Sequence, residues 1–178
     1  GRLLDVGGGA GSHSAYLKAA VPGLDPVVLD LPGVEPVLAE RHPELPFVAG
    51  DLAQPRFGRP AGERWDYVLL ANILHDWPAE RCVEIVREAA GLLERGGTLL
   101  LYEWVLDDGR DSPPDVALFA LMMLVENEGG AAWTESELRG WLQDAGLEQV
   151  EVRRGDGPIV VVRGVRGRQD DTEEAGDE

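Results

Sequence analysis

Apolar runs alternate with segments of helical periodicity from the start of the chain to Val105. Runs of about four to eight apolar residues are typical of buried strands, whereas apolar positions that recur every three or four residues indicate helices. The Arg-Gly-Gly sequence at 95–97 is predicted to end the last helix of this region. The alternation predicts an α/β fold with a mostly parallel sheet and helices on both faces. Strands are predicted at residues 3–6, 26–31, 47–48, 66–71 and 98–105, and helices at 12–20, 33–41 and 79–94.

The pattern changes after Val105. Residues 116–125 are all apolar and predict a helix of about three turns. Thr134 and Glu137 have the spacing of a capping box, which predicts a helix that begins there and closes at Gly146. Two further strands, 148–153 and 158–163, are separated by a segment with an Asp-Gly pair, which is typical of a hairpin. We therefore expect a C-terminal antiparallel hairpin, with one antiparallel strand at the edge of the sheet.

Composition indicates one packed domain, because 44% of the 178 residues are hydrophobic. We place this domain at residues 1–164. Residues 165–178 are predicted to be an acidic disordered tail, since from Arg166 onward they contain six acids and no large apolar residue. The chain opens on Gly1 directly before a strand, so we expect it to be a fragment whose N-terminal portion has been removed.

The net charge of −17 excludes nucleic acid as an expected partner, because an acidic surface repels a phosphate backbone. No run of 18 apolar residues is present, so we expect no membrane span. The single cysteine, Cys82, has no partner for an internal disulfide, which is consistent with a cytoplasmic protein. We predict no metal site.

A glycine-rich loop follows the first predicted strand and precedes a helix. Such a loop exposes backbone amides, and glycine lets a ligand approach them closely. The dinucleotide pattern G-x-G-x-x-G fails here, because serine stands at positions 12 and 14 where it requires glycine. The pattern D-x-G-x-G-x-G is matched by Asp5, Gly7, Gly9 and Gly11. It resembles a loop of S-adenosylmethionine-dependent methyltransferases that holds an amino-acid carboxylate and amine.

Two further acids stand at the ends of the next two predicted strands. Asp30, 19 residues past Gly11, can accept hydrogen bonds from both ribose hydroxyls of a nucleoside. Asp51 can accept one from an adenine amino group. Each acid alone is equally well explained as a turn residue. Their common position at strand C-termini favours a ligand site, because open α/β sheets bind ligands at that edge.

His75 follows the fourth predicted strand and is the candidate catalytic base. A histidine can deprotonate a phenol or another hydroxyl near neutral pH. Glu103 lies among apolar residues of the next strand, where an unpaired carboxylate is costly. A hydrogen bond from Nδ1 of His75 would remove that cost and fix the tautomer. By itself, His75 is better explained as a histidine at a helix start.

The motifs DVGGGAGSHS, LDLPGV, FVAGDL, ANILHDW and GGTLLLYEWVL together resemble those of the catalytic domain of small-molecule O-methyltransferases, such as the caffeate and hydroxyindole enzymes. The resemblance covers residues 2–163 and implies a Rossmann-like class I methyltransferase fold with S-adenosyl-L-methionine as cofactor. It also implies a homodimer in the full-length protein. The residues it implies are Gly7, Gly9, Gly11, Asp30, Asp51 and Leu52 at the cofactor, His75, Asp76 and Glu103 in catalysis, and Met123 and Asn127 at the acceptor.

The sequence departs from the family pattern at two positions. A lysine that is common near the cofactor is replaced by Ala71, and a second glutamate near the base is replaced by Ala132. The expected activity is methyl transfer to a hydroxyl of a small aromatic or polyketide-like metabolite. The alternatives are a nicotinamide-dependent oxidoreductase, a cofactor-binding relative without activity, and a relative that performs hydroxylation or decarboxylation.

Overall fold

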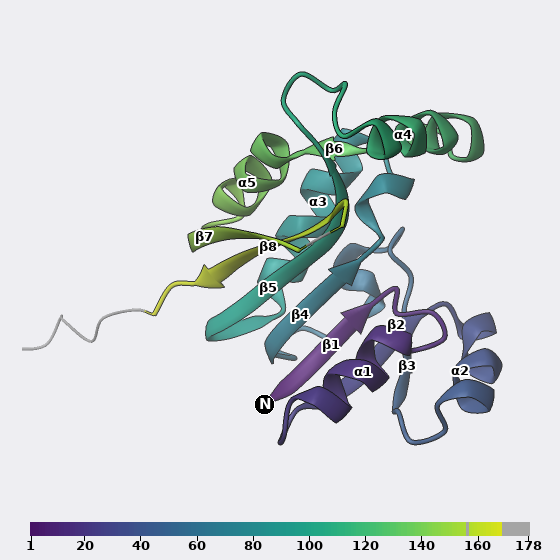
Figure 1. Ribbon diagram of the computed structural model, residues 1–178. Coiled ribbons are helices and arrows are strands. Elements are labelled where there is room, and N and C mark those ends of the chain that lie inside the picture. The colour runs from purple at the N-terminus through teal and green to yellow at the C-terminus, as the bar shows by residue number, and fades with distance from the viewer. Residues whose placement is uncertain (156, 169–178) are drawn as a thin grey trace, which may run out of the picture.

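The computed structural model describes residues 1–155 and 157–168 of the chain (Figure 1). Within them, seven strands form a continuous sheet in the order β3-β2-β1-β4-β5-β8-β7, and β6 pairs with β5 off this path. The strands β1 to β5 run parallel, and β8 is antiparallel to both of its neighbours. The strands are β1 (Arg2–Val6), β2 (Asp25–Asp30), β3 (Phe47–Ala49), β4 (Trp65–Ala71), β5 (Leu93–Leu106), β6 (Trp133–Thr134), β7 (Leu147–Arg154) and β8 (Ile159–Arg166).

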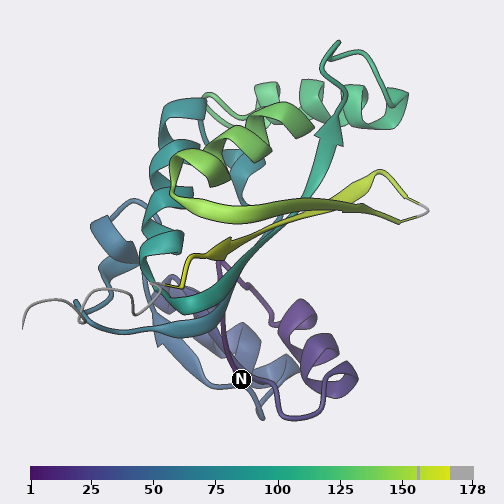
Figure 2. The same cartoon turned by 90° about the vertical axis from the view of Figure 1, so that its left-hand side faces the viewer.

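Helices cover both faces of this sheet (Figure 2). The main core packs α3 and α5 against one face, where Leu4, Val68 and Leu101 are buried. The other face packs against α1 through residues such as Leu3 and Leu17. The mixed α/β fold predicted from the sequence is therefore confirmed. The helices are α1 (Ser12–Ala20), α2 (Glu35–Arg41), α3 (Ala79–Gly91), α4 (Pro114–Glu126) and α5 (Glu135–Asp144), with short 3₁₀ turns η1 (Pro32–Val34), η2 (Pro55–Gly58) and η3 (Leu74–Asp76).

The end of α3 differs from the prediction. The helix stops at Gly91 rather than Glu94, and the Arg-Gly-Gly segment lies inside β5. The strand begins early because Leu93 pairs with Trp65 of β4, whose amide donates to the carbonyl of Leu92. Gly96, with φ +78°, bends the strand at a register shift instead of ending a helix.

The C-terminal hairpin is present, but its antiparallel strand is not at the edge. β8 lies between β5 and β7, so β7 forms the edge of the sheet. β8 extends to Arg166, two residues beyond the predicted domain boundary at residue 164. Residue 156 of the predicted turn and residues 169–178 of the predicted tail lie outside the described residues.

The capping box of α5 is confirmed. The hydroxyl of Thr134 accepts from the amide of Glu137 at 3.2 Å, and the Glu137 carboxylate accepts from the amide of Thr134 at 2.8 Å. No helix in the described part of the chain is long and apolar enough to cross a bilayer.

The apolar helix α4 is only partly core. It lies at the carboxyl end of the parallel strands (Figure 1) and buries Val116 and Met123. The remaining apolar side chains of its outer surface are exposed to solvent. These are Leu118, Leu121, Met122, Leu124 and Val125, which we call the α4 apolar face.

Candidate active site

The glycine loop connects β1 to α1 and has three left-handed glycines. Gly7, Gly9 and Gly11 have φ angles of +71°, +54° and +80°, which side chains rarely adopt. A Cβ on Gly7 would lie 2.3 Å from Ile73 Cδ1, and one on Gly11 would lie 2.4 Å from Leu38 Cδ1, so packing alone explains these two. A Cβ on Gly9 would meet no heavy atom within 4 Å. The bare backbone of Gly9 therefore faces open space, as a ligand-binding loop requires.

Asp5 lies beneath this loop and is almost completely buried. Its Oδ2 accepts a hydrogen bond from the hydroxyl of Ser14 at 2.7 Å, whereas Oδ1 has no partner among the described residues. Burial raises the pKa of Asp5, and the bond from Ser14 offsets part of that rise. The carboxyl group packs under Gly8, where an added Cβ would lie 2.8 Å from its Cγ. Asp5 thus supports the loop from below.

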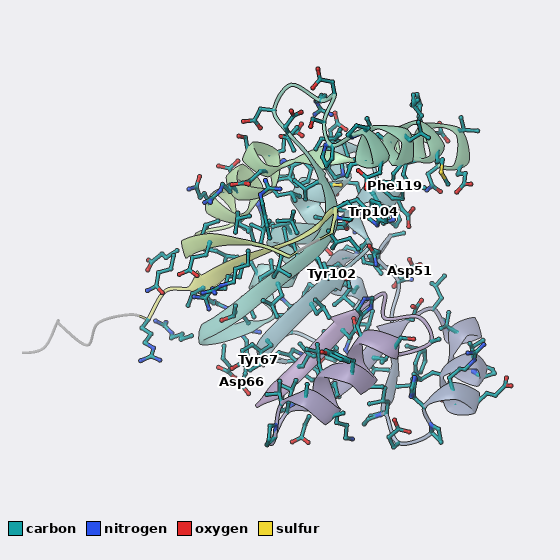
Figure 3. The ribbon with its side chains drawn as sticks, in the orientation of Figure 1. Asp51, Asp66, Tyr67, Tyr102, Trp104 and Phe119 are labelled. Carbon is teal, nitrogen blue, oxygen red and sulfur yellow. The ribbon has the colours of Figure 1, made fainter. Side chains whose placement is uncertain are left out.

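Asp30 ends β2, which is next to β1, and Asp51 follows β3, which is next to β2. Oδ2 of Asp30 accepts from the amide of Gly9 at 2.8 Å, so the carboxylate directly adjoins the glycine loop. Asp51 follows β3, and its Oδ1 accepts from the amide of Ala53 at 2.8 Å. Figure 3 shows Asp51 at the carboxyl edge of the sheet. Because β3, β2 and β1 are neighbours, the structure brings both acids and the loop to one edge.

Leu52, predicted beside them, is almost completely buried. Its Cδ1 lies 4.0 Å from a Cβ built on Gly7, so the side chain packs against the start of the glycine loop.

His75 lies in η3, just after β4, and is 8% exposed. Its Nδ1 is 2.7 Å from Oε2 of Glu103, which is 1% exposed. The other carboxylate oxygen, Oε1, accepts from the amides of Ile73 at 2.8 Å and Leu74 at 2.7 Å. The buried charge of Glu103 is therefore fully hydrogen-bonded, which reduces the cost of its burial.

The environment of His75 raises its pKa and fixes its orientation. Burial lowers the pKa of His75, but the hydrogen bond and charge of Glu103, helped by Asp76, raise the pKa above its ordinary value overall. With Nδ1 directed at Glu103, Nε2 is the nitrogen left to meet a ligand. Oδ1 of Asp76 lies 3.8 Å from Nε2.

Residues of α4 and its C-terminal loop complete the surroundings of His75. Nδ2 of Asn127 donates to Oδ1 of Asp76 at 2.6 Å and lies 3.8 Å from Sδ of Met123. The ring of Phe119 meets the imidazole edge to face, with centroids 4.9 Å apart. Phe119 also stacks on Trp104 at 5.0 Å, and Figure 3 shows the two rings together below α4.

Sequence reasoning missed both of these aromatic residues. Trp104 directly follows Glu103 in an apolar strand, and Phe119 lies in a helix that is apolar on all sides. Neither position therefore has a pattern of its own that distinguishes it from core.

Comparison with known proteins identifies the family. The sequence model of the O-methyltransferase domain family matches residues 1–148 of the chain. The chain belongs to this O-methyltransferase family. The family resemblance and the class I methyltransferase fold predicted from the sequence are both confirmed.

Two curated relatives illustrate the similarity. The 3-hydroxy-5-methyl-1-naphthoate 3-O-methyltransferase of Streptomyces sahachiroi is 36% identical over 169 residues, which cover 93% of this chain and 49% of the relative. The acetylserotonin O-methyltransferase of Mus musculus is 34% identical, and the match covers 93% of this chain and 44% of that protein. The chain therefore spans about half the length of the curated relatives it matches.

Solved structures of the family share the fold. Human N-acetylserotonin methyltransferase in complex with SAM superposes with a TM-score of 0.84 at 26% identity, covering 94% of this chain and 48% of that one. An O-methyltransferase family 2 protein of Planctomyces limnophilus in complex with apigenin gives 0.82 at 29% identity, covering 93% of this chain and 50% of that one.

Two positions where this chain departs from the family pattern are both buried. Ala132 packs with Leu106 and Val116, so an apolar cluster occupies the place of a second glutamate. Ala71 packs with Leu3 and Leu69 on the α1 side of the sheet. Glu103 is therefore the one carboxylate that contacts Nδ1 of His75 among the described hydrogen bonds.

The described residues were also compared with the requirements of a cysteine nucleophile and of a metal site. Burial raises the pKa of the Cys82 thiol to about 12, so Cys82 is not a nucleophile near neutral pH. Across residues 1–155 and 157–168, no group of three or more His, Cys, Asp or Glu side chains is arranged to hold a metal ion.

Proposed function

We propose that this O-methyltransferase transfers a methyl group from S-adenosyl-L-methionine to a hydroxyl of a small aromatic or polyketide-like acceptor. The observation that carries the proposal is the His75–Glu103 contact of 2.7 Å at the same sheet edge as the glycine loop and two acids. The family match supports methyl transfer. The relatives named for naphthoate and acetylserotonin support a small hydroxylated or indolic acceptor.

The cofactor is assigned to the three neighbouring strand ends. The glycine loop lies against its amino-acid portion, and the open space beside Gly9 supports this assignment. Asp30 accepts from the ribose hydroxyls, and Asp51 with Leu52 holds the adenine. When bound, S-adenosyl-L-methionine supplies an electrophilic methyl group on its sulfonium.

His75 acts as the general base in this proposal. Its Nε2 accepts the proton of the acceptor hydroxyl, and Glu103 holds Nδ1–H and stabilises the imidazolium that forms. Asp76 lies close enough to Nε2 to add to that stabilisation. Met123 and Asn127 line the acceptor side, where Asn127 also holds Asp76.

We also propose that the full-length protein is a homodimer that buries the α4 apolar face. Five large apolar side chains on one helix form an exposed apolar surface that a water-facing helix does not require. Size-exclusion chromatography with light scattering tests this proposal. Substitution of Leu121 and Leu124 by glutamate should convert the dimer to a monomer, whereas a wild-type monomer would contradict it.

The decisive experiment for the activity is transfer of labelled methyl from S-adenosyl-L-methionine to a panel of phenols by the full-length protein. A methyl ether product with release of S-adenosylhomocysteine supports the proposal. Cofactor binding without transfer to any acceptor would favour a relative that has lost activity. Saturable binding of NADH would favour the oxidoreductase, against which Ser12 and Ser14 in the glycine motif already argue.

A further inference from the structure

The first turn of α3 contacts two separate loops of the site. Nη2 of Arg81 donates a hydrogen bond to the carbonyl of Leu52, which directly follows Asp51. The next residue, Cys82, donates from its thiol to the carbonyl of Leu74 at 3.1 Å, next to His75. Two adjacent side chains of one helix thus hold the loop assigned to adenine and the segment that carries the base.

Two carboxylates of α3 hold the guanidinium of Arg81 in the position from which it contacts the loop after β3. Its Nη1 donates to Glu84 at 2.7 Å and to Glu88 at 3.1 Å, both on the same helix. The Arg81 side chain is 17% exposed. A guanidinium fixed by two carboxylates loses less conformational freedom when it forms a further bond, so its contact with Leu52 is preorganised.

The loop after β3 is held by contacts within it and by one hydrogen bond from α3. Arg56 and Phe57 both have positive φ angles, and Phe57 is completely buried, which anchors the far end of the loop. The near end is held by the amide of Asp51, which donates to the carbonyl of Phe57 at 3.2 Å, and by the bond from Arg81 to Leu52. Among the hydrogen bonds of the described residues, the Asp51 carboxylate accepts one, from the amide of Ala53. Its position therefore depends on the backbone of this turn, which is held at Asp51 by Phe57 and Gln54 and at the next residue, Leu52, by Arg81.

We propose that Arg81 is a positioning residue for the cofactor: by holding the Leu52 carbonyl, it places the Asp51 carboxylate to accept from the exocyclic amino group of adenine. This inference rests on the proposed function. The proposed effect of Arg81 is transmitted through one backbone carbonyl, that of Leu52. The Cys82 thiol keeps its proton near neutral pH because burial raises its pKa to about 12, so it can donate to the carbonyl of Leu74.

The test compares two ligands that differ at the 6-amino edge of the purine: S-adenosylhomocysteine has an amino group at C6 and an unprotonated N1, and S-inosylhomocysteine has an oxygen at C6 and a proton on N1. Titration calorimetry of the full-length protein gives both dissociation constants for the wild type, Arg81→Gln and Arg87→Gln. Arg87 is the matched control, since it lies exposed on the same helix and undergoes the same change of side chain. Arg81→Lys, which retains a charged donor, serves as the conservative variant.

We expect the wild type to bind the adenosyl ligand more tightly than the inosyl ligand. In Arg81→Gln the ratio of the two dissociation constants should fall by about tenfold, so that most of the preference is lost. Binding of the inosyl ligand should change little, Arg87→Gln should behave like the wild type, and Arg81→Lys should recover part of the preference. The inference is overturned if Arg81→Gln and Arg81→Lys bind both ligands equally less tightly than the wild type, or if their affinities are unchanged. Either result leaves the proposed function intact. A wild type that binds neither ligand overturns both.

Discussion

Both carboxylate oxygens of Glu103 bind the segment that carries His75: Oε2 lies 2.7 Å from Nδ1 of the imidazole, and Oε1 accepts two backbone amides of the same segment. One buried group therefore orients the base and holds the backbone on which it stands. The two roles can be separated by substitution, because glutamine retains an oxygen for the amides but loses the charge.

Replacement of Glu103 by glutamine should lower turnover by about a hundredfold or more, because an amide N–H facing Nδ1 favours the wrong imidazole tautomer. Loss of the negative charge also removes what raises the pKa of His75, so the acid limb of the pH–rate profile should move to lower pH. Steady-state kinetics across pH measures both effects. An unchanged profile would remove Glu103 from the mechanism.

Replacement of Glu103 by alanine should instead destabilise the fold. The amides of Ile73 and Leu74 then lose their acceptor inside the core, at about 1–3 kcal/mol for each buried donor. Urea unfolding measures the loss, with the glutamine variant as the control. Equal stability of the two variants would contradict the hydrogen bonds to the backbone.

His75→Ala should reduce turnover by on the order of 10² to 10⁴, the range typical of a lost general base. The affinity for S-adenosylhomocysteine should stay the same, because His75 is assigned to the acceptor and not to the cofactor. Initial rates and calorimetry together measure the two quantities. Full turnover in this variant would disprove the base assignment.

The raised pKa of His75 predicts opposite effects of pH on catalysis and stability. The base must be neutral, so kcat/KM should rise with pH through a pKa above the ordinary histidine value near 6.5. The protonated imidazole is the form that the fold stabilises. The contribution of protonated His75 to the free energy of unfolding is complete below about pH 6.5, and it is lost as pH rises through the folded-state pKa of His75. A pH series of rates and of urea midpoints checks both trends against His75→Ala.

Two glycines of the loop should respond differently to alanine. Gly9→Ala costs roughly 1–2 kcal/mol for its left-handed backbone but meets no neighbour, so the protein should fold and lose cofactor binding. Gly11→Ala adds overlap with Leu38 and Leu45, which raises the cost by about 1–3 kcal/mol. Thermal melting and S-adenosylhomocysteine titration distinguish them. Tight binding by Gly9→Ala would contradict the cofactor assignment.

Thr134→Ala tests the fold without touching the proposed chemistry. Removal of the cap leaves the amide of Glu137 without its acceptor and should cost about 1 kcal/mol of stability. Turnover per folded molecule should be unchanged. A loss above about 3 kcal/mol would mean that the N-terminus of α5 supports more than its own helix.

Local signals in the sequence were sufficient to predict most of the fold. The glycine loop, the capping box at Thr134 and the apolar runs each depend on neighbours in the chain. The position of β8 between β5 and β7 does not depend on neighbours in the chain, because strand order is decided by long-range pairing such as that of Thr98 with Val165. The early start of β5 is similar, since Leu93 becomes a strand residue through its pairing with Trp65.

The candidate site shows the same division. Carboxylates at strand ends and the pairing of Glu103 with His75 could be predicted, because buried charge requires a partner. The stacking of Phe119 on Trp104 and the bond from Arg81 to Leu52 join residues 15 and 29 positions apart through the folded backbone. No sequence pattern distinguishes these residues from ordinary core or surface positions.

The central claim is that three neighbouring strand ends bind a sulfonium nucleoside and not a nicotinamide dinucleotide. Calorimetric titration of the wild-type protein with S-adenosylhomocysteine and, separately, with NADH tests it most directly. The account predicts saturable binding of one S-adenosylhomocysteine per chain and no binding heat with NADH. Saturable binding of NADH with none of S-adenosylhomocysteine would contradict it.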